Sequence, residues 1–206
     1  MNNRREPIRI TCAGASIVQG CGASDERLYS WPGQLAGLLG ASYAVCNAGA
    51  GGAPAARPEH GGEGSYWERE EFGKGRDFAP RVVTILLGGN DAYQRQRITP
   101  EIFEADYTAL IRSYQELPSR PLVVLMEQTA CHNGDGRQEW VHQYANPIVR
   151  RLGAEMDLPV ILLEQATWEH PEWHSEDGLH FTDAGYGQLA RIIYEALLPI
   201  LEKAGL

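Results

Sequence analysis

Short apolar runs alternate with amphipathic segments five times along this chain, and no other feature restricts its possible folds as strongly. The runs cover residues 8–13, 43–47, 81–87, 122–126 and 160–163. Each run has the length of a buried β-strand, and strands that alternate with helices form parallel sheets covered on both faces. We therefore predict an α/β fold: a three-layer α/β/α sandwich around a five-stranded parallel sheet.

Capping residues mark where the helices between these runs begin and end. Ser30 and Thr99 each precede a segment with proline in its first turn, and Gly40 follows a leucine pair. A hydroxyl side chain before a helix accepts a free backbone N–H, and glycine readily adopts the left-handed conformation after one. Apolar side chains at helical spacing predict two core-facing helices. These side chains are Phe103, Tyr107, Leu110, Ile111 and Tyr114 in one helix, and Tyr186, Leu189, Ile193, Leu197 and Ile200 in the other.

Length and composition favour one globular domain. A chain of 206 residues can bury one core, and 22% charged with 43% hydrophobic residues is typical of globular proteins. We expect a single domain over residues 1–206. The net charge of -9 and the lack of a basic stripe argue against nucleic acid as a partner.

The sequence also indicates location and cofactor use. The first ten residues, MNNRREPIRI, contain no apolar run of signal-peptide length, and no later segment has the roughly 20 apolar residues of a membrane span. The four cysteines lack the paired spacing of a metal site. His170 and His174 have the spacing of a helical metal pair, but Pro171 argues against a helix there. We expect a cytoplasmic protein with no membrane contact, no metal and no cofactor.

Four short motifs follow separate strands of the predicted sheet. They are GASIVQG at 14–20, NAGAGG at 47–52, GGND at 88–91 and DGLH at 177–180. In an open α/β sheet, ligands bind at the carboxyl ends of the strands. Three connections longer than a minimal turn, 47–64, 127–136 and 164–182, are typical of functional loops. The sequence therefore predicts one site built from several strand ends.

Side chains in these motifs could together hydrolyse an ester. Ser16 offers a hydroxyl nucleophile, His180 a base to accept its proton, and Asp177 a carboxylate to hold the imidazole. The Asn90 amide and backbone N–H groups of Ser16 and of a glycine in NAGAGG could donate to the tetrahedral oxyanion. Taken alone, Ser16 could be a polar turn residue and Asp177–Gly178 an ordinary turn. The four motifs in combination favour catalysis.

In this order, the motifs resemble the sequence blocks of the SGNH hydrolase (GDSL-type esterase/lipase) superfamily. Three further stretches, YSWPGQL, SYWEREEF and DGLHFTDAGY, are similar to bacterial acetylesterase-like members that act on acylated sugars. The resemblance covers nearly the whole chain. It implies the flavodoxin-like three-layer α/β/α fold of that superfamily.

The resemblance implies a role for each motif residue. Ser16 corresponds to the nucleophile, His180 to the base and Asp177 to its orienting acid. Asn90 and Gly52 correspond to oxyanion donors, alongside the backbone N–H of Ser16.

Two positions leave this correspondence open. Gly49 is the alternative oxyanion glycine, because the glycines of NAGAGG can be aligned in more than one way. Ala15 stands where the first block of the family usually has aspartate, a carboxylate that helps to tie the catalytic loops together. We expect this change to affect loop order or rate while leaving the proton-transfer groups in place.

We therefore expect a serine esterase that removes a short acyl group, above all acetyl, from a carbohydrate. Trp67, Trp168 and Trp173 could stack on such a sugar. A lysophospholipase or thioesterase is the alternative within the same chemistry. A non-catalytic carbohydrate-binding member is the alternative without it, whereas a nucleotide or flavin module is disfavoured because no phosphate-binding loop is present.

Overall fold

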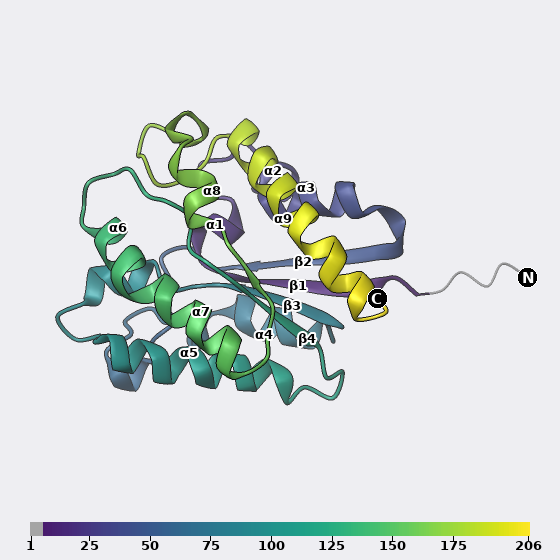
Figure 1. Ribbon diagram of the computed structural model, residues 1–206, viewed down its shortest axis with the longest axis horizontal. Helices are drawn as coiled ribbons and strands as arrows, with labels where there is room; N and C mark the ends of the chain where they lie inside the picture. Colours follow the sequence, from purple (N-terminus) through teal and green to yellow (C-terminus); the bar gives the residue numbers. More distant parts are fainter. Residues whose placement is uncertain (1–5) are drawn as a thin grey trace, which may run out of the picture.

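The structure is a computed structural model that describes residues 6–206, so half of the segment MNNRREPIRI lies outside the described residues. At its centre is a parallel sheet with strand order β2-β1-β3-β4-β5 (Figure 1). The strands are β1 (Ile8–Gly14), β2 (Tyr43–Gly49), β3 (Val82–Leu86), β4 (Leu122–Met126) and β5 (Val160–Ile161). All five predicted strands are confirmed. β1 therefore lies between β2 and β3, at the point where the order of the strands reverses.

The helices cover both faces of this sheet, which confirms the predicted three-layer sandwich. α3 and α9 lie on one face, and α4, α5 and α7 on the other (Figure 1). Their bounds are α1 (Ser16–Gln19), α2 (Glu26–Tyr29), α3 (Trp31–Leu39), α4 (Glu70–Asp77), α5 (Pro100–Gln115), α6 (Arg137–Trp140), α7 (Asn146–Glu155), α8 (Glu164–Trp168) and α9 (Asp183–Lys203). A π-helical turn, Val141–Ala145, joins α6 to α7, and 3-10 turns occur at Gly40–Ser42, Pro58–His60, Tyr66–Glu68, Asn90–Gln94 and Pro171–Trp173.

Strand ends differ from the prediction where glycine or a side chain takes over the backbone hydrogen bonds. β1 and β2 each continue to a glycine, because Gly14 and Gly49 pair in register. β5 stops at Ile161, although the apolar run continues to Leu163. The N–H of Leu163 donates to the Glu127 carboxylate at 3.0 Å instead of continuing the sheet.

Two of the predicted loops also contain regular structure, and the connection 47–64 includes the 3-10 turn Pro58–His60. The connection 164–182 includes α8 and the 3-10 turn Pro171–Trp173. Elements of three to five residues are too short to show a helical period in the sequence, which explains why the pattern did not predict them.

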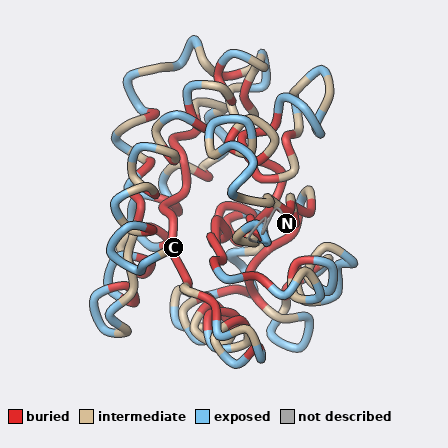
Figure 2. Tube along the Cα trace, turned by 90° about the vertical axis from the view of Figure 1, so that its right-hand side faces the viewer, coloured by how far each residue is buried: buried red, intermediate tan, exposed pale blue. Residues whose placement is uncertain are grey.

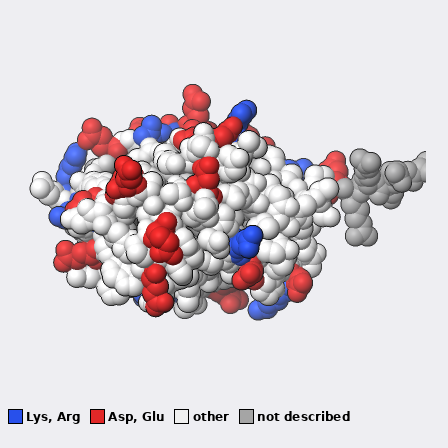
Figure 3. Space-filling view, turned by 90° about the horizontal axis from the view of Figure 1, so that it is seen from above, with Lys and Arg blue, Asp and Glu red and all other residues white. Residues whose placement is uncertain are grey.

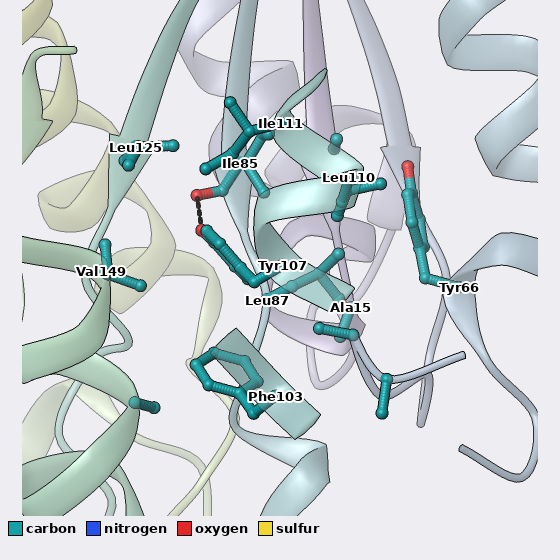
Figure 4. Packing of buried hydrophobic residues seen from close by; sticks show 14 of the residues in the cluster. Ala15, Tyr66, Ile85, Leu87, Phe103, Tyr107, Leu110, Ile111, Leu125 and Val149 are labelled. Carbon is teal, nitrogen blue, oxygen red and sulfur yellow. Dashed lines mark hydrogen bonds between the residues drawn. The ribbon is translucent and has the colours of Figure 1, made fainter. Parts of the chain in front are cut away.

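The predicted caps and core-facing stripes are confirmed. The Ser30 and Thr99 hydroxyls each accept a first-turn N–H at 3.3 Å, and Gly40 ends α3 with φ +70°. All five predicted stripe residues of α5 are buried, and on α9 only Ile200 is half-buried. Figure 4 shows the α5 side of the core, where the Tyr107 hydroxyl donates to the Ile85 carbonyl at 3.2 Å. Buried residues run through the strands and the inner sides of the helices (Figure 2).

The surface carries charges of both signs without a continuous basic area on the face that Figure 3 shows. Acidic side chains are spread over that face and basic ones stand singly among them (Figure 3). Within residues 6–206, no helix has both the length and the apolar character needed to cross a bilayer.

Two glycines let α1 pack directly on the strand ends. A Cβ atom at Gly14 would lie 2.1 Å from Val18 Cγ2, and one at Gly49 would lie 2.1 Å from the backbone nitrogen of Gln19. Real Cβ atoms do not approach other heavy atoms so closely, so any larger residue would displace α1. Because Ser16 is the first residue of α1, these glycines fix where its backbone lies.

Gly49→Ala is expected to lower the free energy of unfolding by about 3 kcal/mol, because the added methyl group meets backbone atoms that cannot move aside. Gly37→Ala is the matched control. It lies within α3, where an added Cβ meets nothing within 4 Å, so the helix preference of alanine should stabilise by about 0.5–1 kcal/mol. Urea unfolding measures both, and equal effects of the two substitutions would contradict the packing argument.

Candidate active site

Ser16 lies where β1 ends and α1 begins. It is 6% exposed, and as the first helical residue its backbone N–H has no acceptor within the helix. Gly20 ends α1 in the left-handed conformation, with its N–H bonded to the Ser16 carbonyl at 2.9 Å. The serine is therefore held at the carboxyl edge of the sheet, as the sequence predicts.

Asp177 and His180 form a hydrogen-bonded pair within one tight turn. The Asp177 Oδ2 atom lies 2.5 Å from Nδ1 of His180, and the other carboxylate oxygen accepts the backbone N–H groups of Leu179 and His180 at 2.9 Å each. The Ser175 hydroxyl donates to the same oxygen at 2.8 Å. The imidazole is thus oriented through Nδ1, and its Nε2 is buried without a hydrogen-bond partner among residues 6–206.

The Asp177 carboxylate stays ionised over the range in which esters are assayed. Partial removal from water raises its pKa, but the hydrogen bonds from the Leu179 backbone, from His180 and from Ser175 outweigh this and hold the pKa well below its usual range. A charged Asp177 favours one imidazole tautomer, with the proton on Nδ1 and a lone pair on Nε2. That is the form a general base requires.

The segment after α1 brings the serine and histidine motifs together. The Tyr186 hydroxyl donates to the Cys21 carbonyl at 2.7 Å, and Asp183 accepts both the N–H and the hydroxyl of Ser24. A Cβ at Gly22 would lie 3.1 Å from that of His180. Within the described chain no hydrogen bond joins Ser16 Oγ to His180, a contact that often forms only when substrate binds.

The structure distinguishes between the two candidate oxyanion glycines. The Gly49 N–H donates to its neighbour Asn47 at 3.0 Å, and that of Gly51 donates to Gln19 Oε1 at 2.7 Å. Gly52 is exposed, has φ +74°, and among the N–H groups of residues 49–53 only its own has no acceptor. A backbone donor must be free to bind an oxyanion, so the geometry favours Gly52 over Gly49.

Asn90 lies beside this glycine and is 5% exposed. Its Nδ2 atom donates to the Ala53 carbonyl at 3.0 Å, which leaves the second hydrogen of the amide without a partner. The loop that carries Gly52 and Ala53 is tied to β1 by the N–H of Ala50, which donates to Gly14 at 2.9 Å. Three strand ends therefore meet around the free donors.

Asp91 supplies a tie between catalytic loops, while Ala15 does not. The Asp91 carboxylate accepts the N–H groups of Ala55 and Ala56 at 2.9 and 3.0 Å, which joins the segment after β3 to the segment after β2. Ala15 is packed into the apolar cluster of Figure 4. The missing aspartate of the first motif is thus replaced at this position by apolar packing.

Burial raises the pKa of Asp91, and the two backbone N–H groups only partly offset that effect. The negative charge of the nearby Asp106 carboxylate adds a smaller increase, and the resulting pKa of Asp91 is about 6. Asp91 is fully buried and is bonded to backbone rather than aimed at the catalytic groups. These contacts give Asp91 a structural role.

Two contributors to the site were not predicted from the sequence. Arg137 donates from Nη2 to Oδ1 of Asn90 at 2.8 Å, and Gln19 holds the Gly51 turn. Arg137 lies in GDGRQEW, a polar stretch whose composition is typical of a surface loop. Only its burial, at 5% exposed, distinguishes it from an ordinary surface arginine.

The histidine pair that resembled a metal site does not converge. The His170 ring stacks on Trp173 with centroids 3.8 Å apart, while Nε2 of His174 bonds the Ala130 carbonyl at 3.2 Å. Within the described residues 6–206, no group of three or more His, Cys, Asp or Glu side chains is arranged to hold a metal ion.

Comparison with known proteins places this arrangement in a family. A model of the GDSL-like Lipase/Acylhydrolase family matches residues 12–188, which span β1 to α9. The chain belongs to this family. The resemblance of its motifs to the SGNH superfamily is thereby confirmed.

Individual relatives of this GDSL-like chain are distant. An acetylxylan esterase of Xylanibacter ruminicola is 24% identical over 94% of the chain, and the chain spans 44% of that protein's length. The lipase/acylhydrolase of Enterococcus faecalis has a solved structure that is 25% identical, with a TM-score of 0.71 over 92% of this chain and 95% of that one. A two-domain esterase active on acetylated mannans is 20% identical, with a TM-score of 0.66 over 93% and 48% of the two chains.

The raised pKa of Asp91 gives the stability of this GDSL-like chain a pH dependence of known sign. The folded-state pKa of about 6 exceeds the value of about 3.9 in an unfolded chain, so the folded protein binds this proton more tightly. The contribution of Asp91 to the free energy of unfolding is therefore fully present below about pH 4 and is lost as pH rises through 6. The two-unit difference corresponds to about 3 kcal/mol. Urea unfolding of the wild type and of Asp91→Asn from pH 4 to 7 measures it. The wild type should lose stability relative to the variant as pH rises. A wild type that instead gains stability relative to Asp91→Asn over this range would contradict the assignment.

Proposed function

We propose that this protein is a serine esterase that removes a short acyl group, above all acetyl, from a carbohydrate. Ser16 is the nucleophile, His180 the base and Asp177 the acid that orients it. The oxyanion is bound by the backbone N–H groups of Ser16 and Gly52 and by the Asn90 amide. This chemistry uses only side chains and backbone of the chain itself.

The reaction proceeds in two half-reactions. His180 Nε2 takes the Ser16 hydroxyl proton as Oγ bonds to the ester carbonyl carbon, and the carbonyl electrons move onto oxygen. When that intermediate collapses, the bond to the sugar oxygen breaks and His180 returns its proton to the leaving alcohol. Water then adds to the acyl-serine with His180 again as base, releasing the carboxylic acid and restoring the Ser16 hydroxyl.

The observation that carries this proposal is the pairing of an oriented base with free donors at one edge of the sheet. The His180 imidazole is fixed through Nδ1 by Asp177, while its Nε2 is buried and unpartnered. The N–H of Gly52 and one Asn90 amide hydrogen are likewise without acceptors. A buried polar group usually has a hydrogen-bond partner, so the free Nε2 of His180, at the same edge of the sheet as the two free donors, supports a shared ligand.

A cleft that none of the proposed catalytic residues lines, but that includes Trp168, supports a carbohydrate as the alcohol part of the substrate. The cleft holds about 720 Å³ and is lined by Trp168, Leu162 and side chains such as Gln138, His142 and Gln165. Trp168 is 47% exposed, and an exposed indole bordered by amides and carboxylates suits a sugar ring with its apolar face and hydroxyl groups.

The Trp168 cleft is joined to the catalytic turn through one residue. The His132 ring lies 5.3 Å from the ring of Trp168, and its backbone N–H donates to the Gly178 carbonyl at 2.7 Å. Gly178 directly follows Asp177 in the sequence. A sugar on Trp168 would therefore lie near the turn that holds the base.

The alternatives differ in substrate or in activity. A lysophospholipase or thioesterase needs a long apolar groove, whereas eight of the ten residues that line the Trp168 cleft are polar or charged. A non-catalytic sugar-binding protein would have no need of an oriented base or free oxyanion donors. The single domain over residues 1–206 and the cytoplasmic location stay predictions.

Ser16→Ala is expected to lower kcat for p-nitrophenyl acetate by at least about 10,000-fold, as removal of the nucleophile does in other serine hydrolases. Ser42→Ala is the matched control, since Ser42 is exposed and precedes β2 at the opposite end of the sheet. It should retain wild-type activity. If Ser16→Ala keeps most of the activity, the assignment of the nucleophile is wrong.

Trp168→Ala is expected to raise KM for an acetylated xylo-oligosaccharide about tenfold, equivalent to about 1.4 kcal/mol of binding. Its KM for p-nitrophenyl acetate, which has no sugar, should not change. Leu38→Ala serves as control, because Leu38 is exposed to a similar degree on the outer side of α3. A Trp168→Ala variant that affects both substrates equally, or neither, would count against the sugar-binding role of the cleft.

A further inference from the structure

We propose that Arg137 is a positioning residue for catalysis: it fixes the orientation of the Asn90 amide and increases the strength of that amide as an oxyanion donor. The inference rests on the proposed function of the site. It adds a residue that acts through Asn90 rather than by touching the substrate.

The contacts of Asn90 leave its amide only one orientation. Arg137 Nη2 donates to Asn90 Oδ1 at 2.8 Å, and Asn90 Nδ2 donates to the Ala53 carbonyl at 3.0 Å. If the amide rotated by half a turn, its NH2 group would face the guanidinium and its oxygen would face a carbonyl. Both contacts would then be repulsive, so Arg137 and Ala53 together keep Nδ2 beside Gly52.

Arg137 is an unusual arginine because it is buried without a direct ion pair. It is 5% exposed, and among residues 6–206 no carboxylate oxygen lies within 4 Å of its guanidinium. Its Nε atom is buried with no hydrogen-bond partner in the described chain. Burying a guanidinium without a direct ion pair costs stability, so the contact with Asn90 explains its position better than a role in folding does.

The remaining contacts of Arg137 orient it without a direct ion pair, and its charge helps to lower the pKa of the nearby Asp135 carboxylate. Its guanidinium lies over the Tyr93 ring, 4.4 Å from the centroid, and its own backbone N–H donates to Asp135 Oδ1 at 2.8 Å. The Tyr93 hydroxyl donates to the same Asp135 carboxylate. The aromatic face and the backbone therefore hold the side chain against Asn90 while its positive charge stays directed at the amide.

A guanidinium that donates to the amide oxygen makes the amide nitrogen a stronger hydrogen-bond donor. It draws electron density toward Oδ1 and makes the Nδ2 hydrogens more positive, so hydrogen bonds in series strengthen one another. A full negative charge develops on the substrate oxygen only in the transition state, whereas the ester is neutral. The effect of Arg137 should therefore appear in kcat far more than in KM.

Three substitutions separate the hydrogen bond that orients the Asn90 amide from the positive charge that strengthens it as a donor. Arg137→Gln keeps a hydrogen-bond donor without charge, Arg137→Lys keeps the charge, and Arg137→Met removes both. With p-nitrophenyl acetate we expect kcat to fall about 100-fold in Arg137→Met at nearly constant KM, with smaller losses in the Lys and Gln variants. Arg76→Met is the matched control. Arg76 also donates to a neutral oxygen, the Ser113 carbonyl at 3.1 Å, and lies 5.1 Å from an aromatic centroid, but it is on α4.

A double-mutant cycle with Asn90→Ala tests whether Arg137 acts through Asn90. If it does, adding Arg137→Met to Asn90→Ala lowers kcat by less than threefold, because the amide that the arginine serves is already gone. Binding of a phenylboronic acid, which forms a tetrahedral anion on the serine, should weaken in Arg137→Met in proportion to kcat.

Several results would overturn the proposal. These are additive losses in the cycle, a change in KM alone, or a kcat effect no larger than that of Arg76→Met. If Arg137→Met does not fold, Arg137→Gln replaces it in the cycle with the same criteria. Ser16→Ala separates failure of the proposed esterase function from failure of the role of Arg137. If Ser16→Ala is inactive while the cycle is additive, the esterase assignment stands and only the role of Arg137 fails.

Discussion

The site depends on close contact between the short helix α1 and the ends of the two strands beneath it. Gly14 and Gly49 pair in register, and neither leaves room for a side chain against Val18 or Gln19. Because the glycines let α1 lie directly on the sheet, Ser16 is placed at the carboxyl end of β1 by packing rather than by a flexible loop. Steric exclusion of this kind fixes position more firmly than a single hydrogen bond, since no small movement relieves it.

The same contact organises the proposed oxyanion donors. Once α1 is in place, Gln19 accepts the Gly51 N–H and the Gly14 carbonyl accepts that of Ala50, so the turn can present only Gly52. Asn90 reaches this turn from β3 through the Ala53 carbonyl. The N–H groups on either side of Gly52 already have acceptors, so in this turn only the Gly52 N–H is free to donate.

The two halves of the site differ in how they are held. On the oxyanion side, Asn90, Asp91 and Arg137 are all buried. Asp91 ties the two loops through backbone N–H groups, while Arg137 contacts the amide itself. On the other side, the Asp177 side chain is 49% exposed and depends on its own turn for orientation. Buried groups such as Asn90 are preorganised to bind a developing charge, whereas the proposed acid Asp177 is partly open to water.

The sequence by itself determined the layers, the alternation of strands and helices along the chain, and the motif residues at four strand ends. These follow from local rules: the period of apolar residues, capping side chains, and the convergence of parallel strands at one edge. Ser16, Asn90, Asp177 and His180 could therefore be named in advance.

Only the tertiary structure decided which glycine has a free N–H, and that Arg137 is buried behind Asn90. Gly49 and Gly52 look alike in NAGAGG, and they differ because Asn47 occupies one N–H and nothing within the described chain occupies the other. Arg137 lies 47 residues from Asn90, so no local period or spacing connects them. Contacts between distant segments depend on how whole elements pack, and a single sequence contains no local pattern that reports them.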